Sequence, residues 1–419
     1  MIGSWFATLL LPRGVDPGAL PLLAARALRA FADGYMAVLL PAYLLAVGLG
    51  TLEVGVIATV TMLGSALATI AVGTWGHRFG SGQMLRVAAL LMAATGIGFA
   101  GCASFWPLLL VAFVGTLNPS SGDVSVFLPL EHARLAGAAS GHARTALFAR
   151  YSVVGAVCAA AGALAAGLPD WLASRTGTAL VVMLRALFVF YAVIGLLVWW
   201  LYRRPAVEPA GGEVPRAAAA LGPSRRIVVR LAALFSIDAF AGGMVVNSLL
   251  ALWLLQRFGL SLAQAGAFFF WAGLLSAASQ LIAPWVARRI GLLNTMVFTH
   301  IPANVCLILA ALAPNLPTVL VLLFVRSALS QMDVPTRTAY VMAVVTPQER
   351  PAAAGFTAVP RSLAAALSPT ISGAMLAAGF LALPLVACGV LKIAYDLALW
   401  RGMRGVNLPE HKDNAAGDD

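Results

Sequence analysis

Two acidic residues, Asp33 and Asp238, lie inside long apolar stretches of the sequence. A charged side chain near the centre of a membrane helix costs about 2.5 to 3.5 kcal/mol on insertion scales, so it is retained only where it serves a function. A carboxyl group in an apolar cavity binds its proton more tightly than in water and can then load and release it near neutral pH. We interpret Asp33 and Asp238 as candidates for proton coupling. Arg29, one helical turn before Asp33, leaves the alternative that it neutralises this carboxylate on the same helix face.

A polar segment interrupts the apolar residues after Leu117. Asn118, Ser120 and Ser121 surround Pro119, which has no backbone N–H to donate. The helix is therefore predicted to bend or open here, and the amide and hydroxyl groups could satisfy the freed carbonyls or contact a substrate. A proline kink patched by the serines, with no substrate contact, is the structural alternative.

Other polar side chains within the apolar stretches are candidates for a substrate cavity: Asn247, Arg326 and Arg337. Arg185, Arg326 and Lys392 could instead bind an anionic substrate, because cationic side chains in a cavity attract carboxylate and phosphate groups. Lys392 and Asp396 are spaced as residues i and i+4 of a helix, and we expect them to neutralise each other.

Several chemistries are not indicated by the sequence. The four cysteines are isolated and the five histidines have no metal-binding spacing, so we expect neither a metal nor another cofactor. The two lysines, Lys392 and Lys412, do not follow glycine, which excludes the Gly-Lys of an ATP-binding phosphate loop. We therefore predict that the protein is not an enzyme.

The composition of the chain indicates which secondary structure carries the candidate residues. Hydrophobic residues make up 61% of the chain and charged residues 10%, with a mean hydropathy of +0.91, which is typical of an integral membrane protein. Unbroken apolar runs indicate helices rather than strands. About twelve transmembrane helices are predicted, at residues 23–48, 54–75, 84–102, 105–129, 146–168, 177–202, 228–256, 262–286, 291–312, 316–341, 352–378 and 381–401.

The net charge of +11 is concentrated in alternate loops, as the positive-inside rule describes. This distribution predicts a multi-pass protein of the cell inner (plasma) membrane with both termini in the cytoplasm. It argues for contact with membrane lipids and against nucleic acid as a partner.

The segment 203–227 is rich in Pro, Gly, Ala and charge, as linkers are. It divides the chain into helical bundles at 1–202 and 228–403, followed by a tail at 404–419. A shift of 210 or 211 residues aligns the two halves, placing Arg150 on Arg361 and Asp123 on Asp333. The chain therefore looks like a duplicated six-helix unit, an arrangement used by secondary transporters.

This all-α architecture resembles the major facilitator superfamily (MFS) over nearly the whole chain. Between the second and third predicted helices, the segment containing Gly73, His77, Arg78 and Gly80 is similar to the family's loop motif. It departs from the motif at His77, where the family has an aspartate, and in the trailing basic pair. The resemblance implies two pseudo-symmetric six-helix bundles and transport by alternating access, although the family's antiporter signature is missing from the fifth predicted helix.

The resemblance also suggests a cytoplasmic gate. In the related fold the fourth helix faces the eleventh and the fifth faces the tenth. We therefore predict that Asp123 pairs with Arg361, and Asp333 with Arg150, when the cytoplasmic opening is closed. A buried ion pair is strong when water is excluded and weak when the opening fills with water, so such pairs can distinguish a closed from an open state. The alternative is a permanent structural pair of Asp123 with Arg150.

The sequence thus predicts a secondary active transporter that moves a small organic solute, with protons as the expected coupling ion. We expect a monomer. The alternative is a polytopic membrane enzyme or a non-transporting membrane sensor. A channel would not explain a two-fold repeat with paired intramembrane charges.

Overall fold

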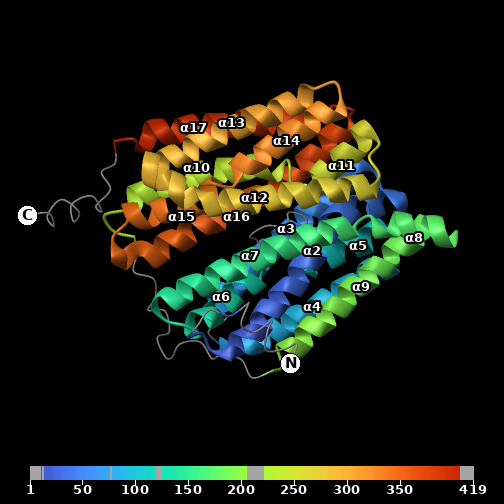
Figure 1. Cartoon of the computed structure of the whole chain (residues 1–419), viewed down its shortest axis with the longest axis horizontal. Helices are drawn as coiled ribbons and strands as arrows, with labels where there is room; N and C mark the ends of the chain where they lie inside the picture. Colours follow the sequence, from blue (N-terminus) through green and yellow to red (C-terminus); the bar gives the residue numbers. More distant parts are fainter. Residues whose placement is uncertain (1–10, 12–13, 76–77, 119–124, 205–220, 406–419) are drawn as a thin grey trace, which may run out of the picture. The chain divides into compact units, whose positions relative to one another are not determined.

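The computed structural model describes residues 11, 14–75, 78–118, 125–204 and 221–405 (Figure 1). All regular structure in these ranges is helical. Packing divides the chain into two compact units: unit 1 contains 1–214, 246–274 and 369–379, and unit 2 contains 215–245, 275–368 and 380–419. The two units are defined by contacts between residues and do not coincide with the two halves of the sequence repeat. The division into bundles at 1–202 and 228–403 therefore remains a prediction.

The helices of unit 1 begin with the short 3₁₀ helix η1 (Pro17–Ala19). They continue with α2 (Leu20–Ala46), α3 (Thr51–Trp75), α4 (Ser81–Gly101), α5 (Phe105–Val114), α6 (Phe127–Gly137), α7 (Gly141–Ala165), α8 (Leu168–Thr176), α9 (Leu180–Leu201) and α11 (Asn247–Phe258). Unit 2 holds α10 (Arg225–Gly243), α13 (Leu292–Leu312), α14 (Leu316–Ser330), α15 (Asp333–Val344), the 3₁₀ helix η3 (Pro347–Glu349) and α17 (Leu383–Met403). Two long helices, α12 (Leu262–Ile290) and α16 (Arg350–Ala377), contribute residues to both units.

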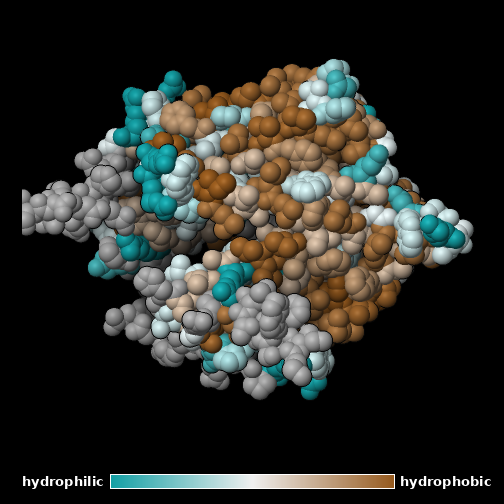
Figure 2. Space-filling model, in the orientation of Figure 1, coloured by the Kyte–Doolittle hydropathy of each residue, from teal (hydrophilic) through white to brown (hydrophobic). Residues whose placement is uncertain are grey.

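Ten helical segments of the described residues are long and apolar enough to cross a membrane. They correspond to ten of the twelve predicted spans. The other two are the fourth, where α5 is shorter, and the eleventh, where α16 is a helix of 28 residues. Large apolar side chains such as Ile97, Leu110 and Leu281 are more than 60% exposed, and Figure 2 shows apolar residues over the outer faces of the helices. Such surfaces suit a lipid environment.

Three predicted spans are interrupted rather than continuous; for the spans 228–256 and 316–341 this corrects the sequence analysis, which expected only the fourth span to bend or open. The predicted span 105–129 ends as a helix at Val114 and resumes at Phe127. The span 228–256 is broken between α10 and α11, directly after the helix-weakening pair Gly242 and Gly243. The span 316–341 is broken between α14 and α15, because Pro335 has no N–H to donate to the carbonyl four residues earlier.

Unit 1 is built on close contacts between helices. Helix α2 packs along α7, and α4 along α9. A Cβ atom added to Gly34 would lie 2.0 Å from the Ala159 carbonyl oxygen, and one added to Gly162 would lie 2.0 Å from that of Phe31. The absence of side chains at both glycines therefore lets the α2 and α7 backbones touch, as small residues do in membrane helix pairs.

The segments 246–274 and 369–379 join unit 1 through similar contacts. Gly55 of α3 meets Gly373 of α16, and Thr59 and Thr370 share a hydrogen bond of 2.8 Å between their hydroxyl groups. Gly266 of α12 lies against the Ala163 carbonyl of α7. Small and hydroxyl-bearing residues thus bring segments distant in sequence into one unit.

Unit 2 has an apolar core of its own, in which α10, α13, α15 and α17 contribute buried residues including Phe235, Val297, Tyr340 and Leu399. At its edge, the carboxylate of Glu349 accepts hydrogen bonds from the Gly222 amide and the Thr346 hydroxyl. The Ser224 hydroxyl also donates to Glu349 and, with these partners, holds the pKa of the Glu349 carboxyl below its usual range. Glu349 therefore ties the residues before α10 to the loop after α15.

Candidate functional site

Six titratable or charged side chains form a buried cluster in unit 2, which we call the ionic network. Its members come from four helices: Asp238 of α10, His300 of α13, Asp333 and Arg337 of α15, and Lys392 and Asp396 of α17. Each is at most 9% exposed. The helices bring them together because α13 packs against α15 and α17, and α10 packs against α17. The sequence analysis had considered four of these six, Asp238, Asp333, Arg337 and Lys392, for functional roles.

Asp238 is the centre of the ionic network. Lys392 Nζ donates a hydrogen bond of 2.6 Å to its Oδ1 atom, and Arg337 lies 3.4 Å from its Oδ2 atom. The Nε2 atom of His300 is 4.0 Å from Oδ1. Two permanent cations, Lys392 and Arg337, therefore lie close enough to pair with the ionised carboxylate.

His300 lies between two carboxylates. Its Nδ1 atom is 3.0 Å from both carboxylate oxygens of Asp396, on the opposite side of the ring from Asp238. Asn304, one turn along α13, hydrogen-bonds to the Asp396 carboxylate and donates to the His300 carbonyl oxygen at 2.9 Å. An imidazole in this position can hold a proton on one nitrogen and pass it through the other.

Asp333 and Arg337 close the ionic network on α15. They form an ion pair across one helical turn, and Arg337 also lies over the ring of Phe235 at 5.4 Å. Three carboxylates thus face two permanent cations and one histidine. A buried cluster is most stable near electrical neutrality, which this one reaches by binding one proton.

The expected pairing of Lys392 with Asp396 was wrong. Lys392 donates to Asp238 on α10, whereas Asp396 contacts His300 on α13. Both residues lie on α17 one turn apart, but each faces a neighbouring helix that offers an opposite charge. The preference of a helix for i and i+4 pairs is weak, about 0.2 to 0.5 kcal/mol, and contacts between helices override it here.

A second buried cluster lies in unit 1, around Glu131 of α6. Its carboxylate forms an ion pair with Arg29 of α2 and accepts hydrogen bonds from the hydroxyl groups of Tyr151 and Tyr202, the latter at 2.6 Å. The guanidinium of Arg29 lies 4.1 Å from the ring centre of Phe127. Glu131 escaped the sequence analysis because the fourth predicted span ended at residue 129. The helix in fact begins again at Phe127, which places Glu131 inside it.

Both clusters contain a buried ion pair that joins two helices. In unit 1 the cation lies on α2 and its acid on α6; in unit 2 the acid lies on α10 and a cation, Arg337, on α15.

The other predicted site residues are dispersed. Asp33 lies on α2, where the charges of Arg29 and Arg26 reach it. Asn118 is buried after α5, and Asn247 is the first residue of α11. Arg326 is partly buried on α14. Ser120, Ser121, Asp123 and His77 lie outside the described residues.

The predicted gate and loop residues are described in part. Arg150 lies on α7 and Arg361 on α16, each with interactions of its own. Gly73 lies on α3, and Arg78 and Gly80 are exposed between α3 and α4. The pairs of Asp123 with Arg361 and of Asp333 with Arg150 remain predictions.

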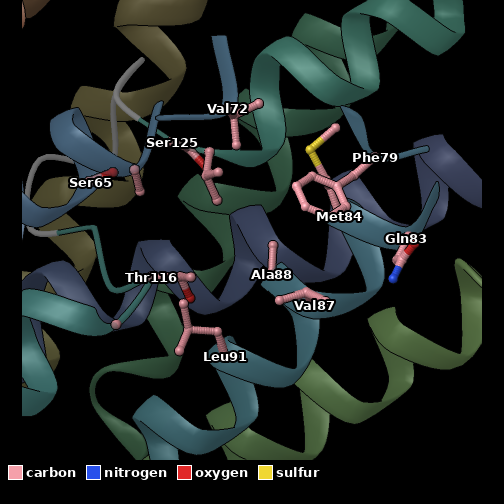
Figure 3. A pocket seen from close by; sticks show the side chains of 13 residues that line it. Ser65, Val72, Phe79, Gln83, Met84, Val87, Ala88, Leu91, Thr116 and Ser125 are labelled. Carbon is pink, nitrogen blue, oxygen red and sulfur yellow. The ribbon is translucent and has the colours of Figure 1, made fainter. Parts of the chain in front are cut away.

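A cavity of about 330 Å³ opens within unit 1 between α3, α4 and the residues that follow α5 (Figure 3). Met84, Val87, Ala88 and Leu91, all from α4, contribute to its apolar lining. The polar lining residues, Ser65, Gln83, Thr116 and Ser125, carry no charge. This cavity is suited to an apolar group, in contrast to the ionic network of unit 2.

Comparison with known proteins identifies the family. The sequence profile of the Major Facilitator Superfamily matches residues 22–323, well over half of the chain. The chain belongs to the Major Facilitator Superfamily. It is 24% identical over 406 residues to an uncharacterized membrane protein of Saccharomyces cerevisiae, covering 89% of this chain and 91% of the yeast protein.

Solved MFS transporters share its fold. The nucleoside transporter NupG superposes with a TM-score of 0.71 at 14% identity, over 92% of this chain and 98% of its own. A bacterial homologue of the human lysosomal transporter Spinster gives 0.71 at 17% identity, over 92% and 96%. The D-xylose–proton symporter gives 0.70 at 15% identity, over 91% and 97%. The chain is therefore an all-helical membrane protein with the MFS transporter fold, as the sequence indicated.

Proposed function

We propose that this MFS protein is a secondary active transporter that moves a small organic solute by alternating access, with protons as the coupling ion. The ionic network of unit 2 carries the proposal. A structural ion pair needs two members, whereas this network holds six titratable or charged groups within membrane-spanning helices. Retaining so many charges there has a large energetic cost, which indicates a functional role.

The arrangement of the ionic network favours a proton as the coupling ion. Lys392 and Arg337 hold Asp238 as an anion, which leaves the His300–Asp396 pair as the part of the network that can gain or lose a proton. Gain of one proton brings the six groups to neutrality. We therefore propose that Asp238 acts by anchoring the network and that the proton resides on His300 or Asp396, with Asp33 as a second candidate.

The solute site and gate complete the proposal. Asn118, Ser120, Ser121, Asn247, Arg326 and Arg337 are candidates for solute contact. We propose that Asp123 with Arg361 and Asp333 with Arg150 close the cytoplasmic opening. The distribution of basic residues supports a location in the inner (plasma) membrane with both termini cytoplasmic, and we propose that the protein acts as a monomer. A proton symporter among the proteins of similar fold is compatible with this proposal.

The test is proton movement by purified protein in proteoliposomes that contain a pH-sensitive dye. Pooled metabolites are added under an imposed pH gradient, and the Asp33→Asn variant is measured beside the parent. We expect one pool to trigger a pH change in vesicles that contain the parent protein. Loss of this response in Asp33→Asn would assign the proton to Asp33, and its retention would assign it to the ionic network.

Solute uptake without any proton movement would contradict proton coupling and leave facilitated diffusion. If no pool is transported while a pool is chemically altered, the alternative of a membrane enzyme replaces the proposal. Empty vesicles with the same gradient provide the control for passive leakage.

A further inference from the structure

Arg326 differs from the charged residues of the ionic network in having no ion pair. Its side chain on α14 makes no hydrogen bond or ion pair with any residue that the structure describes, and its Nε atom is shielded from solvent without a partner. The Nε–H group is thus a shielded donor whose desolvation is not offset by a hydrogen bond. The side chain is partly exposed, so an anion can reach it.

Several other cations within the helices are already engaged. Lys392 donates to Asp238, and Arg337 contacts both Asp333 and Asp238. In unit 1, Arg29 pairs with Glu131, and Arg185 lies at the hydroxyl group of Tyr43. Arg326 is therefore the cation near the ionic network that a bound anion would stabilise most.

Arg326 also lies near the ionic network. Its neighbour Cys388 on α17 is close to both Arg326 and Lys392, and the charge of Arg326 reaches the imidazole of His300. This proximity follows from the packing of α13 against both α14 and α17. An event at Arg326 can therefore change the electrostatic environment of His300.

We infer that Arg326 binds the carboxylate or phosphate group of an anionic substrate, and that binding there promotes the uptake of one proton by the His300–Asp396 pair. This inference rests on the proposed transport function and adds the class of substrate to it. A guanidinium group can donate two parallel hydrogen bonds to either anion, which gives both strength and orientation.

The link to the proton follows from the charges that surround His300. Asp238 on α10 and Asp396 on α17 favour a protonated imidazole. Lys392 on α17, Arg337 on α15 and Arg326 on α14 oppose it. The remaining neighbours are Tyr395, which is neutral, and Asp333, which is paired with Arg337.

An anion at Arg326 cancels one of the three repulsions, and no other charge in this set changes. The proton is taken from bulk solvent, so one negative charge bound at Arg326 and one proton together add no net charge to the site. Each ligand consequently promotes the binding of the other by the same factor, as thermodynamic linkage requires.

Calorimetric titration of the purified full-length protein tests both parts. Sodium benzoate, sodium succinate and sodium phenyl phosphate are the probes, and each is titrated in two buffers that differ in ionisation enthalpy, which yields the number of protons taken up. The variants are Arg326→Gln, Arg326→Lys and His300→Gln. Arg289→Gln is the matched control, because it removes one positive charge from an exposed position stacked on Trp285.

We expect at least one probe to bind the parent with uptake of close to one proton, and the same in Arg289→Gln. Arg326→Gln should weaken binding about tenfold or more, since a hydrogen-bonded charge pair is lost, while Arg326→Lys keeps part of the affinity. His300→Gln should bind the anion without proton uptake. Binding of benzoate or succinate would indicate a carboxylate substrate, and binding of phenyl phosphate would indicate a phosphate substrate.

Absence of binding by all three probes, or equal affinity in Arg326→Gln and Arg289→Gln, would overturn the inference. Anion binding with no proton uptake by the parent would overturn its second part. These results are independent of transport: a protein that carries a neutral solute with protons retains the proposed function and loses this inference. A protein that binds the anion but moves no protons in vesicles loses the proposed function and retains this inference.

Discussion

Replacing Asp238 with alanine is expected to lower the free energy of unfolding by about 3 to 5 kcal/mol, the range observed when one partner of a buried ion pair is removed. The substitution leaves Lys392 without its hydrogen-bond acceptor and takes from Arg337 one of its two carboxylates. Water cannot replace them, because Asp238 is 3% exposed and its neighbours are similarly buried. Unfolding in mixed micelles of increasing denaturing detergent, followed by tryptophan fluorescence, measures this loss.

The double variant Asp238→Leu with Lys392→Leu provides the matched comparison. It removes Asp238 together with the lysine that donates a hydrogen bond to it, and leaves Arg337 with Asp333. We expect it to recover at least half of the lost stability, because replacement of a whole buried pair by apolar residues is often neutral or favourable. Stability of Asp238→Ala equal to that of the parent would contradict the description of Asp238 as the centre of the network.

The second large effect is expected in unit 1, where Glu131→Ala should also lower the free energy of unfolding by about 3 to 5 kcal/mol. The carboxylate of Glu131 is fully buried and is contacted by Arg29, Tyr151 and Tyr202, which come from elements around α6. Its removal leaves one buried cation and two hydroxyl groups without an acceptor. The same detergent titration measures the change.

Glu131→Gln separates charge from hydrogen bonding. Its amide oxygen can still accept from a tyrosine hydroxyl, so the loss should be smaller than for alanine, whereas Tyr202→Phe alone should lose about 1 kcal/mol. Equal stabilities of Glu131→Ala and Tyr202→Phe would show that Arg29 does not depend on Glu131. Because Glu131 follows the interrupted fourth span, this cluster is also what fixes α6 to α7 and to the end of α9.

Much of the fold could be predicted from the sequence. Unbroken apolar runs determine the helices, and the loop motif around Gly80 with the duplicated register indicates the family, which the sequence profile confirms. Pro119 predicted that the fourth span would bend or open; α5 ends at Val114, before that residue, and Pro119 itself lies outside the described residues. These features depend on local chemistry, which a sequence displays directly.

The composition of the ionic network could not be predicted in the same way. His300 was considered only for metal-binding spacing, and its role depends on Asp238 and Asp396, which are distant in sequence and adjacent through packing. Lys392 and Asp396 appeared to be partners by spacing, yet each contacts another helix. A histidine in the middle of an apolar stretch was the available signal, and an apolar span that contains one is better treated as a candidate proton site.

The most direct test of the account is the ratio of protons to solute moved by His300→Gln in proteoliposomes, with the solute identified by the pooled screen. Glutamine retains a hydrogen-bonding side chain but cannot carry a proton. We predict that the parent moves protons together with solute and that His300→Gln moves solute with little or no proton movement. A variant that transports with the same proton-to-solute ratio as the parent would contradict the assignment of the coupling proton to the ionic network.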